Sequence, residues 1–150
     1  MQRHVIDQIS QSLEKMPLRR HQLLIVCEDF NESYVQATAD TLQLPLINVN
    51  QLLSSKLKDL PAERRPHKVQ SLLADAIKHV NSHVICLHHI EICFEPSLKQ
   101  HPLRLFELLS RQHTLIVSWK GTYEKDELVY ASPDHPEYVR AAVDAIVIQT

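Results

Sequence analysis

The segment at residues 23–34 reads LLIVCEDFNESY, and it decides how the chain folds. Its beginning, Leu23 to Val26, is a short continuous apolar run, which is typical of a strand buried on both faces of a parallel sheet. The residues from 32 to 43 then place apolar side chains at helical spacing. A buried strand that passes through a short turn into a helix predicts a βα unit.

The same alternation of strand and helix continues outward from this segment. Helices are predicted at 4–16, 32–43, 50–60, 67–81 and 102–111, and strands at 23–26, 46–49, 84–87, 115–117 and 145–148. Asn50 is expected to cap the third helix, the stretch at 61–66 to be a loop, and residues 123–130 to form a hairpin. Apolar strands separated by helices indicate right-handed βαβ crossovers. We therefore predict an α/β fold, a three-layer αβα sandwich around a five-stranded, mostly parallel sheet.

Length and composition set limits on the protein class. The chain has 150 residues and no internal repeat or interdomain linker, so we expect one domain over 1–150. The formal net charge of −2 provides no overall field toward nucleic acid or anionic lipid. No stretch approaches the roughly 20 apolar residues that span a bilayer. The three cysteines lack a C-x-x-C spacing and suit a reducing compartment, so a cytoplasmic protein is expected.

The turn after the first predicted strand lacks the residues that bind phosphate. Ligands of open parallel sheets bind at the carboxyl ends of the strands, where a P-loop has the pattern G-x-x-x-x-G-K-[ST]. Here Cys27 and Glu32 stand at the glycine positions, Ser33 at the lysine and Tyr34 at the hydroxyl residue. The chain has a single glycine, Gly121.

The charge of this turn also opposes a nucleotide. Glu28, Asp29 and Glu32 place carboxylates where a triphosphate would lie, and each like-charge contact costs on the order of 1–4 kcal/mol. The third predicted strand should end in the acidic residue that holds Mg²⁺, but His88 is there, and Glu91 follows three residues later. We predict no ATP hydrolysis and no bound cofactor.

Several segments resemble the small P-loop-containing BrxF proteins of type 3 BREX systems, which are bacterial anti-phage defence modules. The resemblance rests on the order and spacing of LPLINVN (44–50), IEICF (90–94), PLRL through LSR (102–111), WKG (119–121) and HPEY (135–138). It implies an ASCE-type core with strand order 5-1-4-3-2, similar to an AAA+ core without its helical lid. It also places Arg111 where AAA+ proteins often keep an arginine finger. Family members have a glycine- and lysine-containing loop and an aspartate, so both nucleotide motifs are degenerate here.

Other features allow two interpretations each. His83, Cys86, His88, His89 and Cys93 suggest a metal cluster, but side chains that alternate along a strand do not converge, and we predict no metal. The basic residues around 56–68 fit either solvated helix ends or phosphate contacts. Arg111 fits either an arginine finger or a charge that complements a helix dipole.

The resemblance and the lost motifs together indicate a non-catalytic subunit that binds other BREX proteins, reaches DNA indirectly and is free to form oligomers. The candidate contact residues are Phe30, Tyr34 and Trp119, because aromatic side chains are enriched in binding hot spots. The alternative is that these aromatics pack inward as core. Two other functions stay open: an atypical nucleotide-binding regulator that uses Arg111 and Glu91, and a DNA-binding accessory subunit.

Overall fold

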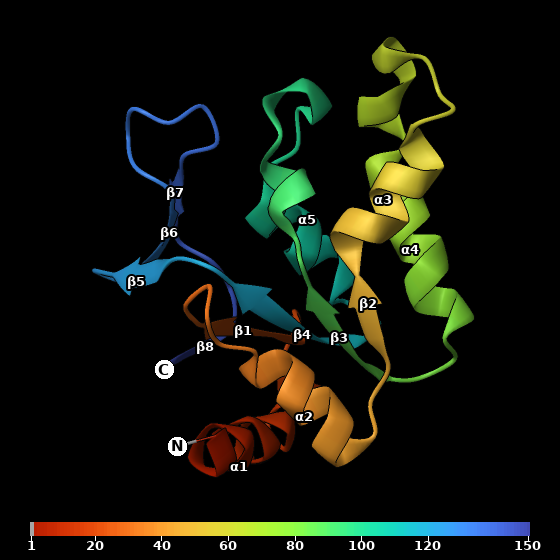
Figure 1. Cartoon of the computed structure of the whole chain (residues 1–150). Coiled ribbons are helices and arrows are strands. Elements are labelled where there is room, and N and C mark those ends of the chain that lie inside the picture. Colours follow the sequence, from red (N-terminus) through yellow and green to blue (C-terminus); the bar gives the residue numbers. More distant parts are fainter. Residues whose placement is uncertain (1) are drawn as a thin grey trace.

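The computed structural model describes residues 2–150, which form a five-stranded parallel sheet flanked by helices (Figure 1). The helices are α1 (Gln2–Leu13), α2 (Tyr34–Leu42), α3 (Val49–Leu57), α4 (Val69–His79) and α5 (Pro102–Leu109). The large sheet contains β1 (Leu23–Cys27), β2 (Leu46–Asn48), β3 (Val84–His88), β4 (Thr114–Trp119) and β8 (Ile146–Gln149). Shorter 3-10 helices are η1 (Met16–Leu18), η2 (Ala62–His67), η3 (Glu91–Phe94) and η4 (Pro96–Leu98).

The strand order is β2-β3-β4-β1-β8, and every neighbouring pair in this sheet is parallel. Counting only these five strands, the order is 2-3-4-1-5, which is the order that the resemblance implies. The continuous apolar runs of β1 and β4 are fully buried, as expected for central strands covered on both faces. The predicted α/β fold with a five-stranded parallel sheet is therefore confirmed.

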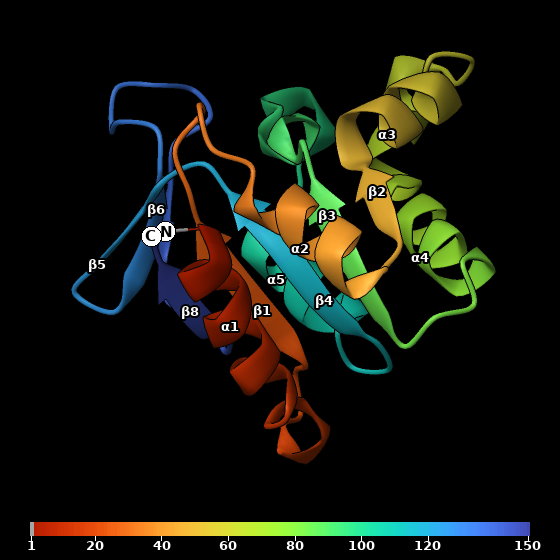
Figure 2. The ribbon, with the colours of Figure 1, turned by 60° about the horizontal axis from the view of Figure 1, so that its bottom comes forward.

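Helices cover both faces of the large sheet. Figure 2 shows α1 and α2 side by side over one face, where Leu24 and Val26 of β1 point. Leu23 and Ile25 alternate to the other face and belong to the hydrophobic cluster that includes the buried residues of α3, α4 and α5. The sheet thus separates the two hydrophobic clusters, one on each face. The carboxyl ends of the strands form one edge of this layered structure, and their amino ends form the opposite edge.

A second, antiparallel sheet follows β4 and packs on the same side as α5. It consists of β5 (Thr122–Glu124), β6 (Glu127–Tyr130) and β7 (Val139–Ala141), in the order β5-β6-β7. The predicted hairpin is confirmed as β5 and β6, whereas β7 was not expected, because its short segment lacks an apolar run. Gly121 is required at the junction, since a Cβ there would lie 2.0 Å from the Val129 carbonyl oxygen.

Two local predictions in the first half of the chain were wrong. The third helix begins at Val49, and its cap is Asn48, whose Oδ1 accepts from the Gln51 N–H at 3.0 Å. Asn50 lies inside the first turn, where its Oδ1 instead accepts from the Ile92 N–H at 2.8 Å. The proline-bounded stretch predicted as a loop forms η2. The spacing of apolar residues shows neither which asparagine caps α3 nor that the stretch forms a 3-10 helix.

None of the helices described over residues 2–150 is long and apolar enough to cross a membrane.

Candidate functional site

The turn after β1, residues 28–33, lies at the carboxyl edge of the large sheet. Cys27 ends β1 and pairs in register with Trp119, the last residue of β4. The Glu28 N–H donates to the Trp119 carbonyl oxygen at 3.0 Å, which prolongs the pairing by one residue. This edge is where open α/β sheets bind ligands, so the turn stands in the position of a phosphate-binding loop.

The Glu28 carboxylate lies inside this turn. The Glu28 side chain is 1% exposed, and its Oε1 accepts from the Tyr34 backbone N–H at 2.6 Å. Oε2 accepts from the Ser118 hydroxyl and lies 3.8 Å from the Lys120 ammonium. Tyr34 is the first residue of α2, and a helix N-terminus attracts negative charge because its N–H groups are unpaired. A carboxylate of the chain itself therefore occupies the place where a P-loop would bind phosphate.

Lys120 holds the rest of the turn in place. Its ammonium donates to the Asp29 carbonyl oxygen at 3.0 Å and to the Glu32 carbonyl oxygen at 2.7 Å. The Tyr34 hydroxyl donates to Glu32 Oε2 at 2.6 Å. This hydrogen bond lowers the pKa of Glu32 and raises the pKa of Tyr34. Ser33, which stands where a P-loop has its lysine, is exposed, and its side chain does not cap α2.

Lys120 and Ser118 were not predicted from the sequence as site residues. They come from β4 and the residue after it, about ninety positions beyond the turn residues that they contact. The signal that could have found them is the strand order, because strands 1 and 4 are neighbours in a 5-1-4-3-2 sheet. The residue that follows strand 4 then lies beside the turn that follows strand 1.

Cys27 is not an activated nucleophile. Burial raises the pKa of its thiol to about 12, and the neighbouring Glu28 carboxylate adds to the shift. The thiolate is the reactive form, so this thiol is inert near neutral pH. Burial likewise raises the pKa of Cys86 and of Cys93 to about 12.

His88 ends β3 at the same edge and is partly buried. Burial lowers the pKa of His88 to about 4, and the nearby His89 and Lys120 add to this effect. The imidazole is therefore neutral at physiological pH. A neutral imidazole cannot replace the Mg²⁺-binding carboxylate that was missing from the sequence pattern, because hard cations prefer oxygen ligands.

Glu91 lies just beyond β3, after a turn in which His89 has a positive φ of 50°. Its Oε1 is 4.0 Å from the His89 Nδ1, and its Oε2 is a buried oxygen without a hydrogen-bond partner among residues 2–150. The Asn50 N–H donates to the His89 carbonyl oxygen at 2.7 Å and fixes the turn. Glu91 therefore lies beyond the carboxyl end of β3, beside His89.

The three aromatic contact candidates have different environments. Phe30 is 75% exposed at the tip of the turn, and Tyr34 is partly buried. Trp119 is fully buried: its ring packs against Phe94 and Tyr130, and its indole N–H donates to the Val129 carbonyl oxygen at 3.1 Å. The prediction that Trp119 offers a contact surface is corrected, because the small sheet covers its ring.

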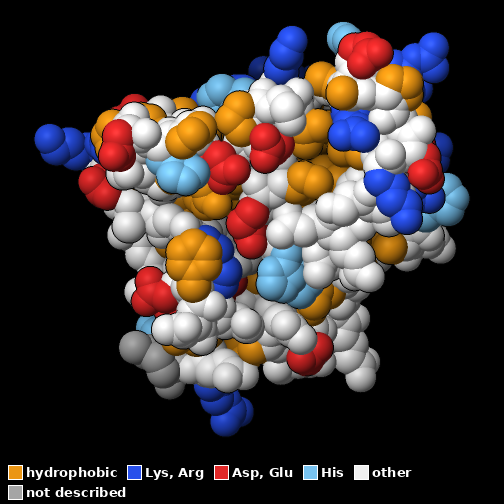
Figure 3. Space-filling view, turned by 45° about the horizontal axis from the view of Figure 1, so that its top comes forward, with side chains coloured by type: hydrophobic (Ala, Val, Ile, Leu, Met, Phe, Trp, Pro, Cys, Tyr) orange, Lys and Arg blue, Asp and Glu red, His pale blue; other side chains and the backbone are white. Residues whose placement is uncertain are grey.

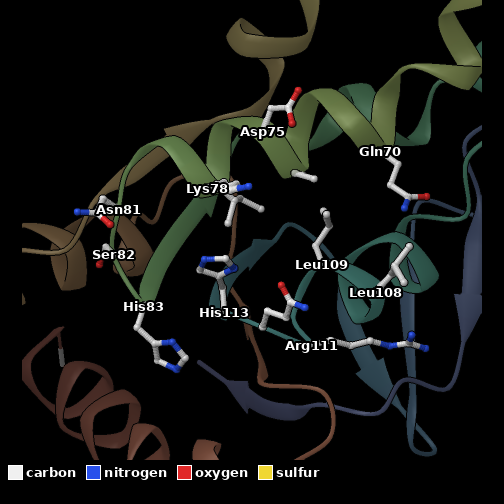
Figure 4. A pocket seen from close by; sticks show the side chains of 13 residues that line it. Gln70, Asp75, Lys78, Asn81, Ser82, His83, Leu108, Leu109, Arg111 and His113 are labelled. Atoms are coloured by element: carbon white, nitrogen blue, oxygen red, sulfur yellow. The ribbon is translucent and has the colours of Figure 1, made fainter.

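Arg111 lies at the opposite, amino-terminal edge of the sheet. It lines a groove of about 770 Å³ between α4 and α5, together with His83 and His113, which immediately precede β3 and β4. Figure 4 shows Arg111 and His83 toward opposite ends of this groove, with His113 between them. Since Glu91 follows the carboxyl end of β3, the two residues cannot hold one nucleotide together within a single chain.

The proposed metal ligands are also separated. Cys86 packs in the cluster beneath α1 and α2, whereas Cys93 packs in the cluster on the other face. His83 precedes β3, and His88 and His89 lie at its far end. Within the described part of the chain, no three His, Cys, Asp or Glu residues are grouped to hold a metal ion.

A scan against models of protein families found no match, and a search of curated proteins found none either.

Proposed function

We propose that this chain is a non-catalytic, P-loop-like subunit that binds partner proteins in a bacterial anti-phage complex of the BREX type. One observation supports it above all: the Glu28 carboxylate receives the Tyr34 N–H and lies near the Lys120 ammonium. A phosphate would need the same groups. The turn is filled by its own anion, so a nucleotide would have to displace a buried carboxylate against its hydrogen bonds.

The same turn supports a role in binding proteins. Lys120 holds two of its carbonyl oxygens, so the loop presents Phe30 on a fixed backbone. A loop whose backbone is already ordered loses little further backbone freedom on binding. The exposed Asp29 beside it favours a basic surface on the partner. The resemblance to BrxF proteins supports other BREX proteins as the partners.

Anion binding to a Glu28→Ala variant tests the internal-anion argument. The variant should open a site for inorganic phosphate at the start of α2, so millimolar phosphate should raise its melting temperature and leave that of the parent chain unchanged. Glu28→Gln is the matched control, since it fills the space without the charge. Micromolar binding of ATP–Mg²⁺ to the parent chain, measured by calorimetry, would overturn the proposal.

Co-expression with the neighbouring genes tests the proposal that the chain binds partner proteins. If these encode a PglZ-type phosphatase and a methyltransferase, one of them should co-purify with the parent chain. Phe30→Ala should weaken that complex by about tenfold or more while its melting temperature stays close to that of the parent chain. Leu18→Ala is the matched control, because Leu18 is also an exposed apolar residue but lies away from the turn. Equal recovery of the partner with both variants would contradict a role for the turn.

A further inference from the structure

The charge of the chain is distributed unevenly. Residues 56–68 contain five Lys and Arg against two Asp and Glu, a formal charge of +3 within a chain whose total is −2. The five cations, which we name the basic corner, are Lys56, Lys58, Arg64, Arg65 and Lys68. They lie where α3 ends, along η2 and before α4 (Figure 1). Figure 3 shows Lys and Arg side chains gathered over this corner, while many of the acidic side chains in the view lie toward the other side.

Among residues 2–150, these cations have no acidic partners. Lys56, Lys58, Arg64 and Lys68 are exposed, and none of the basic corner takes part in an ion pair among residues 2–150. Their charges are therefore available to a ligand and are not neutralised by the protein.

The backbone that carries the basic corner is held by hydrogen bonds. Arg65 Nε donates to the Leu60 carbonyl oxygen at 3.0 Å. Gln100 Nε2 donates to the Pro66 carbonyl oxygen at 2.9 Å and to the Leu98 carbonyl oxygen at 2.7 Å, which ties η2 to η4. A ligand that binds this corner does not have to order the loop first.

The helix dipoles do not reverse the positive electrostatic potential of the basic corner. The C-terminus of α3 and the N-terminus of α4 lie on either side of η2 and carry opposite partial charges of roughly half a unit each. These contributions largely cancel, so the side chains set the potential. The first turn of α4 contains no acidic residue, and no side chain caps it. That end of the corner is thus also compatible with a phosphate oxygen.

We propose that the basic corner binds the phosphate backbone of nucleic acid without sequence preference. Phosphate contacts need only cations and carry no base information. A protein partner would instead be expected to find an apolar or aromatic anchor. Over the described residues, the large apolar side chains that are well exposed are Leu18, Phe30 and Val80, and none belongs to the corner. The proposal does not depend on the turn after β1.

The test is fluorescence anisotropy of a labelled DNA duplex of arbitrary sequence, titrated over a series of salt concentrations. The parent chain should bind, and the logarithm of its affinity should fall with the logarithm of salt with a slope of about −3, as about three phosphate contacts require. Lys58→Glu with Arg64→Glu should weaken binding at low salt by at least about tenfold and reduce the slope by about two.

The matched control carries the same change in net charge on another part of the surface. Arg3→Glu with Lys15→Glu reverses two exposed cations on or next to α1 and should leave the affinity within about twofold of the parent chain. Absence of binding at low salt, or equal weakening by the two double variants, overturns the proposal. Binding to anionic phosphatidylserine vesicles that is lost in the corner variant while DNA binding is kept also overturns it. Phe30→Ala should bind the duplex normally, which separates this proposal from the one about protein partners.

Discussion

The turn after β1 and the basic corner are both charged segments next to a helix N-terminus. The main charges of the turn are hydrogen-bonded within the fold, whereas the charges of the corner are exposed. In the turn, the Glu28 carboxylate is buried and bonded to groups of α2 and β4, and Lys120 is bonded to backbone carbonyls. In the corner, the exposed cations have no acidic partner among residues 2–150.

This difference separates charges that stabilise the fold from charges that are free to act on a ligand. Removal of a buried, hydrogen-bonded charge destabilises the fold, because the groups that it contacted are left without partners. An exposed charge contributes little to stability, so its presence in a cluster has to be explained by solubility or by binding. Measurements of stability can therefore test which residues of this protein belong to each class.

The largest expected effect is the contrast between two aromatic residues at the same edge. Trp119→Ala removes a fully buried ring that packs against Phe94 and Tyr130, so it should lower the free energy of unfolding by about 3–5 kcal/mol. Phe30→Ala should change it by no more than about 0.5 kcal/mol, because the ring is exposed. Urea denaturation followed by circular dichroism measures both. Similar losses for the two variants would mean that Phe30 is part of the core.

The next effect compares two acidic residues in the turn. Glu28→Ala should destabilise the fold by about 2–4 kcal/mol, because it leaves the Tyr34 N–H and the Ser118 hydroxyl without their acceptor. Asp29→Ala, one position later and exposed, should have an effect below about 0.5 kcal/mol. The same urea titration applies. A Glu28→Ala chain as stable as the parent would show that the carboxylate does not fill the turn.

A smaller effect compares a cation from each region. Lys120→Met keeps most of the side-chain volume but removes the ammonium from the Asp29 and Glu32 carbonyl oxygens, and it should cost about 1.5–3 kcal/mol. Arg64→Met in the basic corner should stay within about 0.5 kcal/mol of the parent chain. Melting temperatures of the two variants, compared side by side, give the answer. Equal losses of stability in the two variants would show that Lys120 contributes no more to the fold than an exposed cation does.

The smallest effect concerns pH. Because the pKa of His88 is about 4 in the folded chain and ordinarily 6.5, the unfolded chain binds more protons between these values. Stability should therefore fall as the pH drops from 6.5 toward 4, by on the order of 1 kcal/mol for this partly exposed group. A His88→Gln variant should lose that part of the pH dependence. If its denaturation midpoint falls with pH as steeply as that of the parent chain, the imidazole is not the group responsible.

Local sequence patterns determined most of the fold. The apolar runs at β1, β3 and β4 are too continuous for exposed strands, and the helical spacing between them demanded crossovers on both faces. The absence of P-loop residues in the turn was equally plain from the sequence, because glycine and lysine at fixed positions are a local requirement.

Only the tertiary structure decided which residues meet. Glu28 reads in the sequence as one of three carboxylates that repel phosphate, whereas in the fold it accepts hydrogen bonds from the Tyr34 N–H and the Ser118 hydroxyl and lies near Lys120. The sequence is equally compatible with Trp119 at the surface and in the core, whereas in the fold β6 covers it through Val129 and Tyr130. Such contacts join residues far apart in the chain, and the free energy that selects them comes from packing between elements, which no local pattern records.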